Sequence, residues 1–180
     1  MLVAQQKRNE NIAEYILYLY QIEDLIRAFQ FNVSNIETKL VSQYQVEDKK
    51  RQEISDWYKN LVVMMEKEQI QEKGHFQFLI NLINDLNELH LKLMDSGIDK
   101  AYVNEFKSIS GLITELNVKG NTIKNDVQTS LDAVYGFLLL RMQKKEITEE
   151  TTEAIKRISN WLGNLSKMFK DFESGDLEFE

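Results

Sequence analysis

"ISDWYKNLVVM" occupies residues 54–64, and a near copy, "ISNWLGNLSKM", occupies residues 158–168. The apolar letters of both stretches recur at steps of three and four residues, which places them on one face of an α-helix. This spacing alone explains most of the likeness between the two stretches. A duplicated unit would continue on both sides and repeat further, whereas these stretches diverge at once. We therefore predict two amphipathic helices of one helical body, each anchored by its tryptophan.

The same helical spacing continues along almost the whole chain, without the two-residue alternation that is typical of strands. Short connections between the predicted helices favour antiparallel neighbours. The sequence thus predicts an all-α, single-domain bundle of six or seven mostly antiparallel helices over residues 1–172. An acidic, flexible tail is expected over residues 173–180. The predicted helices cover approximately residues 9–31, 34–46, 48–72, 75–94, 99–120, 121–145 and 148–172.

Helix starts are marked by residues whose side chains can accept a hydrogen bond from an unpaired backbone N–H. Ser34 and Glu37 stand three residues apart, which is the spacing of a capping box. Single capping residues are expected at the other starts, where short polar side chains are preferred. These are Asp48, Asp99, Asn121 or Thr122, and Thr148.

Three glycines, Gly111, Gly136 and Gly163, lie inside predicted helices. Each should cost up to about 1 kcal/mol relative to alanine. We expect close approach of a neighbouring helix to compensate for this cost.

Composition excludes several classes of function. The chain of 180 residues has no cysteine and a formal net charge of -7, so disulfides are excluded and binding to nucleic-acid phosphates is disfavoured. The longest apolar run, residues 134–140, is far shorter than the roughly 20 residues of a membrane-spanning helix. The first residues lack the order of a signal peptide. We expect a cytoplasmic protein that binds neither nucleic acid nor membrane.

The stretch "AEYILYLYQIEDLIRAF", residues 13–29, is the most apolar of the predicted helices. One side of the helix carries a broad apolar arc, and the opposite side carries further apolar residues. A helix that is apolar nearly all round is either central or covered by a partner. Leu17, Tyr20 and Phe31 are therefore candidate interface residues.

Polar residues on the same helix could form a ligand site. Glu23 falls inside the apolar arc, and Arg27 is placed one turn later to pair with it. A structural ion pair is the favoured interpretation, and a functional carboxylate in a pocket is the alternative. Tyr15 and Tyr18 could line such a pocket, although tyrosines at this spacing more often belong to a core or an interface.

The only two histidines, His75 and His90, fall on the apolar side of the fourth predicted helix. They are separated by about 22 Å along a helix axis, so they cannot share a metal ion. Hydrogen-bonded core histidines are the favoured interpretation. His75 stands at a helix start after Gly74, so it is the better candidate for a ligand site.

Two partial matches to metal-binding motifs lack the further residues or helices that such sites need. Residues 72–75 match Glu-x-x-His, but dimetal bundles need a second copy, which the chain lacks. Glu149, Glu150 and Glu153, followed by Glu173 and Asp176, match the letters of a magnesium-binding pyrophosphohydrolase, but the second pair lies in the tail. Phosphate-binding glycine loops and serine nucleophile motifs are absent. We predict no catalytic residues, metal or cofactor.

Three segments together resemble a family of uncharacterised proteins. They are "AQQKRNENIAEYILYLYQIEDLIRAF", "GHFQFLINLINDLNELHLKLM" and "VYGFLLLRMQKKEITEETTEAIKRISNWLG". The family is a domain of unknown function from Bacteroidetes bacteria, with all-helical members of about 180 residues. The resemblance implies a single helical domain and carries no activity, cofactor or site residue to this chain.

Function is therefore unknown from the sequence, and two hypotheses remain. The leading one is a non-enzymatic helical interaction protein, a homodimer or a module for a protein partner. The alternative is a small-molecule-binding or enzymatic helical bundle with a pocket near the first predicted helix. A helix-turn-helix regulator would need a basic recognition helix, which none of the predicted helices supplies.

Overall fold

The computed structural model describes residues 2–120 and 124–179, and this part of the chain contains helices and no strand. The predicted all-α class is confirmed, but these described residues form eight α-helices instead of six or seven. The helices are α1 (Leu2–Glu10), α2 (Ile12–Ala28), α3 (Val33–Lys39), α4 (Asp48–Lys67), α5 (Gln77–Ser96), α6 (Lys100–Gly120), α7 (Asp126–Met142) and α8 (Glu149–Ser174). A 3₁₀ turn, η1 (Val41–Gln43), follows α3.

The extra helix arises because the first predicted helix is interrupted at Asn11. This residue is extended, with φ -155°, and its side chain accepts a hydrogen bond from the Glu14 backbone N–H. Asparagine competes for backbone hydrogen bonds in this way, so it favours helix starts over helix interiors. The predicted start at Asn9 and end at Phe31 were therefore wrong, because α1 ends at Glu10 and α2 at Ala28.

The predicted caps have mixed outcomes. Asp99 accepts from the N–H groups of Ala101 and Tyr102, and Thr148 accepts from Thr151, so both are confirmed. The capping box at Ser34 was wrong, because Asn32 caps α3 and Glu37 instead pairs with Lys59. Two further starts differ from prediction: Asp48 lies inside α4 after an uncapped start at Glu47, and Asn125 caps α7. The expected cap at Asn121 or Thr122 lies outside the described residues.

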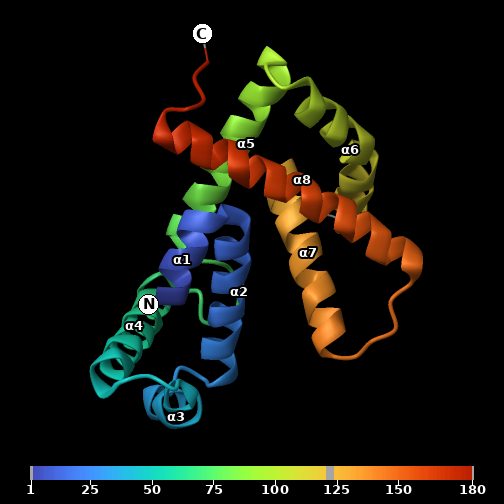
Figure 1. Cartoon of the computed structure of the whole chain (residues 1–180). Coiled ribbons are helices and arrows are strands. Elements are labelled where there is room, and N and C mark those ends of the chain that lie inside the picture. Colours follow the sequence, from blue (N-terminus) through green and yellow to red (C-terminus); the bar gives the residue numbers. More distant parts are fainter. Residues whose placement is uncertain (1, 121–123, 180) are drawn as a thin grey trace.

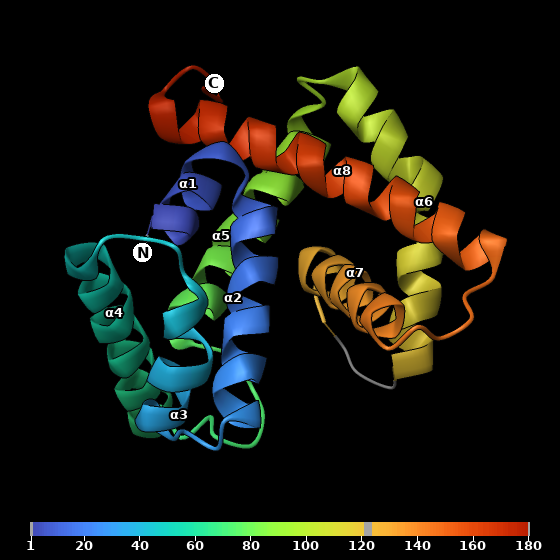
Figure 2. The ribbon, with the colours of Figure 1, turned by 60° about the horizontal axis from the view of Figure 1, so that its bottom comes forward.

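Helix α8 is the longest helix and crosses the others (Figure 1). It packs against α2, α5, α6 and α7. Helices α1 to α4 lie beside its C-terminal half, and α6 and α7 lie beside its N-terminal half (Figure 2). The buried core follows these contacts and is continuous from α2 to α8. α8 therefore joins the two groups of helices.

The two tryptophans of the repeated motif lie in different surroundings. Trp161 on α8 is fully buried and contacts the rings of His90 and Phe106. Trp57 on α4 is half-buried, and its ring meets Tyr58 edge-on. Helices α4 and α8 lie apart in both views (Figures 1 and 2). The two copies of the motif thus serve different parts of the core.

The expected compensation for the helical glycines was wrong. A Cβ atom added at Gly111, Gly136 or Gly163 would meet no atom within 4 Å. Neighbouring helices in the chain therefore do not require glycine at these positions. Gly74 differs, because its φ of +97° is a conformation that other residues rarely adopt.

The C-terminal residues are partly packed. Helix α8 extends to Ser174 and ends at Gly175 in the left-handed conformation, which is a common helix C-cap. Leu177 and Phe179 then lie against the core. Among the described helices, none is long and apolar enough to cross a membrane.

Candidate functional site

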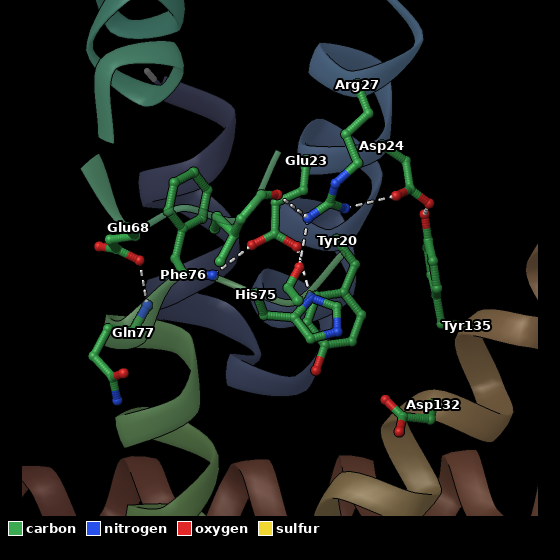
Figure 3. Close-up of polar contacts among 12 residues, drawn as sticks. Tyr20, Glu23, Asp24, Arg27, Glu68, His75, Phe76, Gln77, Asp132 and Tyr135 are labelled. Carbon is green, nitrogen blue, oxygen red and sulfur yellow. Dashed lines mark hydrogen bonds and ion pairs between the residues drawn. The ribbon is translucent and has the colours of Figure 1, made fainter. Parts of the chain in front are cut away.

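A buried carboxylate, Glu23 on α2, forms the centre of a polar cluster (Figure 3). Its side chain is fully buried. One oxygen accepts from the Phe76 backbone N–H at 2.8 Å, and the other lies 2.6 Å from His75 Nδ1. A buried charge is tolerated only when it is paired and hydrogen-bonded. Glu23 satisfies this requirement by binding the start of α5.

The start of α5 depends on carboxylates from elsewhere in the chain. Its own N-cap residue, Phe76, has no side chain that can accept a hydrogen bond. Glu23 accepts from Phe76 N–H, and Glu68 accepts from Gln77 N–H at 2.7 Å. Negative groups are also favoured at a helix N-terminus by the helix dipole. These two acids therefore serve as caps for α5.

Arg27 holds the segment that leads into α5. Its guanidinium donates to the carbonyl oxygens of Ile70 and Gly74 and pairs with Asp24 at 2.9 Å. The expected pair between Glu23 and Arg27 is thus replaced by one pair for each residue. Asp24, the ion-pair partner of Arg27, lies on the same helix. The partner of Glu23 and the two carbonyl partners of Arg27 lie on the α4–α5 connection, which helical spacing does not reveal.

Tyr20 connects this cluster to α7. Its ring stacks on His75 with a centroid distance of 3.8 Å, and its hydroxyl accepts from Gln128. The Tyr135 hydroxyl donates to Asp24 at 2.6 Å. Figure 3 shows the rings of His75 and Tyr20 lying together, with Tyr135 reaching Asp24 from the side of α7. The polar cluster therefore links α2, the α4–α5 connection and α7.

His75 is the residue of the cluster that could bind a ligand or exchange a proton. A Glu23 carboxylate can only accept, so His75 donates from Nδ1. In the neutral imidazole, Nε2 then carries a lone pair that can accept a hydrogen bond. The side chain is 29% exposed, which allows a ligand or a proton to reach it. Within the described residues, no group of three or more His, Cys, Asp or Glu is arranged to hold a metal ion.

His90 is separate from this cluster and lies in the core. It is 1% exposed, and its Nδ1 lies 2.8 Å from the Tyr102 hydroxyl. Burial lowers the pKa of His90 to about 4. This placement matches the favoured prediction of a hydrogen-bonded core histidine.

The other candidate residues of the first predicted helix lie within or against the core. Tyr20 is 1% exposed, so a partner cannot reach it in this structure. The apolar side of α2 that suggested an interface faces α7 at Tyr20. The remaining candidates, Tyr15, Leu17, Tyr18 and Phe31, are partly buried and pack against the core. Burial raises the pKa of Tyr15 and of Tyr18.

Five surface hollows formed by the described residues lie away from the candidate residues. Five hollows of about 230 to 500 Å³ are described, and other residues line them. The largest lies between α6 and α8 beside Tyr102 and Asn164. Four of the candidates, Tyr20, Glu23, Arg27 and His75, thus belong to one polar cluster, and none of the candidates lines any of these five hollows.

The second half of α7 leaves apolar residues uncovered. We call residues 135–142, "YGFLLLRM", the apolar end of α7. The fully buried residues of α7 all precede it, and the last of them is Val134. Within it, Tyr135, Phe137 and Leu138 are partly buried against the core. Leu140 is 42% exposed and Met142 is 72% exposed. This end projects away from α8, with α2 diverging from it (Figure 1).

In the sequence, the overlapping run 134–140 excludes a membrane span and carries no interface prediction. Its apolar residues follow one another on all sides of the helix, which is typical of a helix that other helices or a partner bury on every side. That pattern could have indicated the surface before the structure was known. Residues 13–29 are also apolar on more than one side, but there other helices of the chain cover much of the apolar surface.

A family model described as "Domain of unknown function (DUF4924)" matches residues 1–176. The chain belongs to this family. No curated protein and no solved structure matches this DUF4924 chain. The family assigns no activity, so function must be argued from the residues above.

Proposed function

We propose that this protein is a non-enzymatic helical interaction protein, and that it binds protein through the apolar end of α7. The observation that supports this proposal is the exposure of Leu140 and Met142 in the last turns of α7, where apolar residues follow one another. Contiguous exposed apolar surface commonly marks a protein-binding site. The predicted interface thus moves from the first helical stretch to α7. Bacteroidetes origin and cytoplasmic location stay predictions.

The alternative function, ligand binding or catalysis near the first helical stretch, keeps one supporting observation. The imidazole of His75 is held by Glu23 and is partly exposed. However, two other candidate groups, Glu23 and His90, are sealed from solvent. Glu23 also caps α5, which accounts for its burial without a ligand. We therefore favour the interaction function.

The proposal can be tested with a tagged chain that carries Leu140→Glu and Met142→Glu together. Two charges on the apolar end should abolish protein binding because a buried charge without a partner is costly. The tagged chain is incubated with an untagged copy and with an extract of the producing cells, and retained proteins are identified by mass spectrometry. We expect the wild type to retain a defined protein and the double variant at least tenfold less.

Val118→Glu is the matched control. Val118 is an apolar residue of α6 with 75% exposure, outside the apolar end. This variant should retain the same protein as the wild type. Equal retention by the double variant, or no retention by the wild type, would refute the interaction function at α7. Circular dichroism checks that every variant is folded.

A further inference from the structure

Helix α1 is a short, polar helix that covers one flank of α2. It lies beside α2 in both views and packs mainly against that helix (Figures 1 and 2). Among the side chains of residues 3–10, only Ala4 is buried. Of the described residues, the continuous core includes none from α1 and begins at Ile12. Burial of apolar surface is the main force that holds a helix to a core, so α1 is weakly held.

Two ion pairs join α1 to its neighbours. The Lys7 ammonium lies 2.9 Å from the Glu14 carboxylate on α2. The Arg8 guanidinium donates two hydrogen bonds to Glu173 on α8, at 2.6 and 3.0 Å. The exposed fractions of these four side chains lie between 33% and 58%. Exposed pairs contribute little to stability and are weakened by salt, so α1 can leave its place while the core stays folded.

Hollows on two sides of α1 show that this helix does not fill the space that it occupies. On the side of α8, a hollow of about 390 Å³ lies between Asn9 and Phe169. On the side of α4, a hollow of about 230 Å³ lies between Gln5, Tyr44 and Ile54. Protein interiors are otherwise packed as densely as organic crystals. The space between α2, α4 and α8 is therefore larger than α1 requires.

We propose that α1 is a displaceable cover, and that the groove beneath it binds a helical segment of a protein partner. We call this surface the α1 groove. Its walls are Glu14 on α2, Tyr44, Val46 and Ile54 before and within α4, and Phe169 and Glu173 on α8. The α1 groove is separate from the apolar end of α7, so this inference goes beyond the proposed function and can fail independently of it.

The charges of the α1 groove select a basic segment. When α1 leaves, Glu14 and Glu173 lose Lys7 and Arg8 as partners. These two bases stand three and four residues after Ala4, and residues at this spacing lie on one face of a helix. A partner segment with a small residue followed by a basic pair at that spacing would make the same contacts. The net charge of -7 also attracts a basic segment at long range.

The hollow beside Gln5 gives a partner an advantage over α1. The other residues that line this hollow include Tyr44, Val46 and Ile54, which are apolar. A leucine at the position of Gln5 would bury apolar surface there, and this burial is favourable. Helix α1 has the opposite advantage, because its covalent tether gives it a high effective concentration. The partner segment that fits best therefore has leucine between the small residue and the basic pair.

Hydrogen exchange followed by NMR tests the release of α1. Arg8→Gln removes one ion pair, so we expect the amides of residues 7–10 to exchange roughly two- to fivefold faster than in the wild type. Added salt should accelerate the same amides in the wild type. Lys59→Gln is the matched control, because it removes an exposed pair with Glu37 away from α1, and it should leave these rates unchanged. Equal rates in Arg8→Gln and wild type, without an effect of salt, would overturn the displaceable cover.

A fluorescent peptide of residues 2–10 that carries Gln5→Leu tests the α1 groove. Anisotropy is measured as the full chain is titrated to millimolar concentration. The Arg8→Gln chain should bind the peptide roughly two- to fivefold more tightly than the wild type, because its own cover is weaker. Adding Glu173→Lys to that chain should weaken binding by roughly tenfold or more, because like charges then meet.

A peptide with Lys7→Glu and Arg8→Glu is the matched control, and it should not bind. Absence of binding between the first peptide and both chains would refute the α1 groove. Equal binding of the two peptides would refute the selection of a basic segment.

A chemical lock distinguishes the α1 groove from other surfaces. Gln5 and Lys50 line the same hollow, and the chain has no native cysteine. A bismaleimide linker can therefore tie α1 to α4 when Gln5→Cys and Lys50→Cys are added to the Arg8→Gln chain. The linked chain should lose peptide binding, and the unlinked chain should keep it. Binding that survives the linker would overturn the α1 groove.

Light scattering of the unlinked and linked chains identifies the occupant. We expect both chains to be monomeric in the absence of a partner. A dimer that the linker prevents would place α1 of a second copy in the α1 groove, and it would refute the assignment to a protein partner.

Discussion

At position 90, the fold removes a histidine from water and surrounds it with aromatic rings. Tyr102, Phe106 and Trp161 all contact the imidazole. Its Nδ1 lies within hydrogen-bond distance of the Tyr102 hydroxyl. Desolvation disfavours the charged form of a histidine, which is why the pKa falls to about 4. The neutral ring is therefore part of the core at neutral pH.

The low pKa predicts a loss of stability in mild acid. An unfolded histidine has a pKa of about 6.5, so it binds a proton below that pH while folded His90 stays neutral down to about pH 4. Its contribution is fully present above pH 6.5 and is lost as the pH falls. We expect the free energy of unfolding to decrease by about 2 kcal/mol between pH 7 and pH 5.

Urea unfolding at a series of pH values measures this effect, with His90→Gln as the comparison. The variant should be less stable at pH 7 but should show a flatter pH dependence. Burial raises the pKa of Asp126, the acid nearest to His90 Nε2 at 3.9 Å. That shift has the opposite sign, because protonation of Asp126 then favours the folded state. An identical slope in wild type and variant would contradict the assignment to His90.

At the scale of single helices, side-chain caps and glycines decide where each helix begins and how stable it is. Asn11, Asn32, Asn125 and Thr148 each accept a backbone hydrogen bond at the start of a helix. Helix α5 instead borrows its caps from Glu23 and Glu68. Local sequence therefore marks the first kind of start, and only tertiary contacts supply the second.

The helical glycines should behave differently from the loop glycine. Gly111→Ala and Gly163→Ala should each raise the free energy of unfolding by up to about 1 kcal/mol, because alanine is the better helix former and the added Cβ meets open space. Gly74→Ala should instead lower it by about 1 kcal/mol or more. There φ is +97° and the new Cβ would lie 3.3 Å from Ile70 Cγ2.

Urea unfolding of the three single variants provides the comparison, and Gly74→Ala serves as the control for a required glycine. Destabilisation by Gly111→Ala or Gly163→Ala would contradict the open space at that glycine, because it would mean that another group packs against the position.

At the scale of the whole molecule, a few long-range contacts join helices that are distant in sequence. Arg8 on α1 pairs with Glu173 on α8, and the Ser166 hydroxyl accepts from Ala13 N–H. The cluster around Glu23 joins α2 to α5 and α7. These contacts hold the group α1–α4 to the group formed by α6, α7 and α8.

Loss of the central carboxylate should therefore weaken the joint between helices. Glu23→Ala leaves the Phe76 N–H and the His75 ring without their buried partner, so we expect a loss of roughly 1–3 kcal/mol in the free energy of unfolding. Amide exchange at Phe76 should also accelerate. Hydrogen exchange followed by NMR measures both the local and the global opening.

Glu68→Ala is the matched control, because Glu68 caps the next residue of the same helix from a partly exposed position. Its loss should accelerate exchange at Gln77 and cost about 1 kcal/mol or less, since water can replace an exposed cap. Equal costs for the two variants would contradict the importance of burial at Glu23.

The sequence by itself determined the helical class, because apolar spacing of three and four residues is a local property that survives any packing arrangement. It also located the caps at Asp99 and Thr148, whose partners lie within one turn. It could not place the partner of Glu23 or the carbonyl partners of Arg27, which come from a connection more than forty residues later. Nor could it decide which apolar helix the chain would cover.

Only the tertiary structure decided that last point. Both residues 13–29 and residues 135–142 are apolar on more than one side, so their sequences alone predict the same need for cover. The packing of α7, α8 and the α4–α5 connection around α2 buries Tyr20 and its neighbours. The second half of α7 projects beyond these neighbours and leaves Leu140 and Met142 exposed. Burial depends on which elements meet, and this information is distributed over the whole chain.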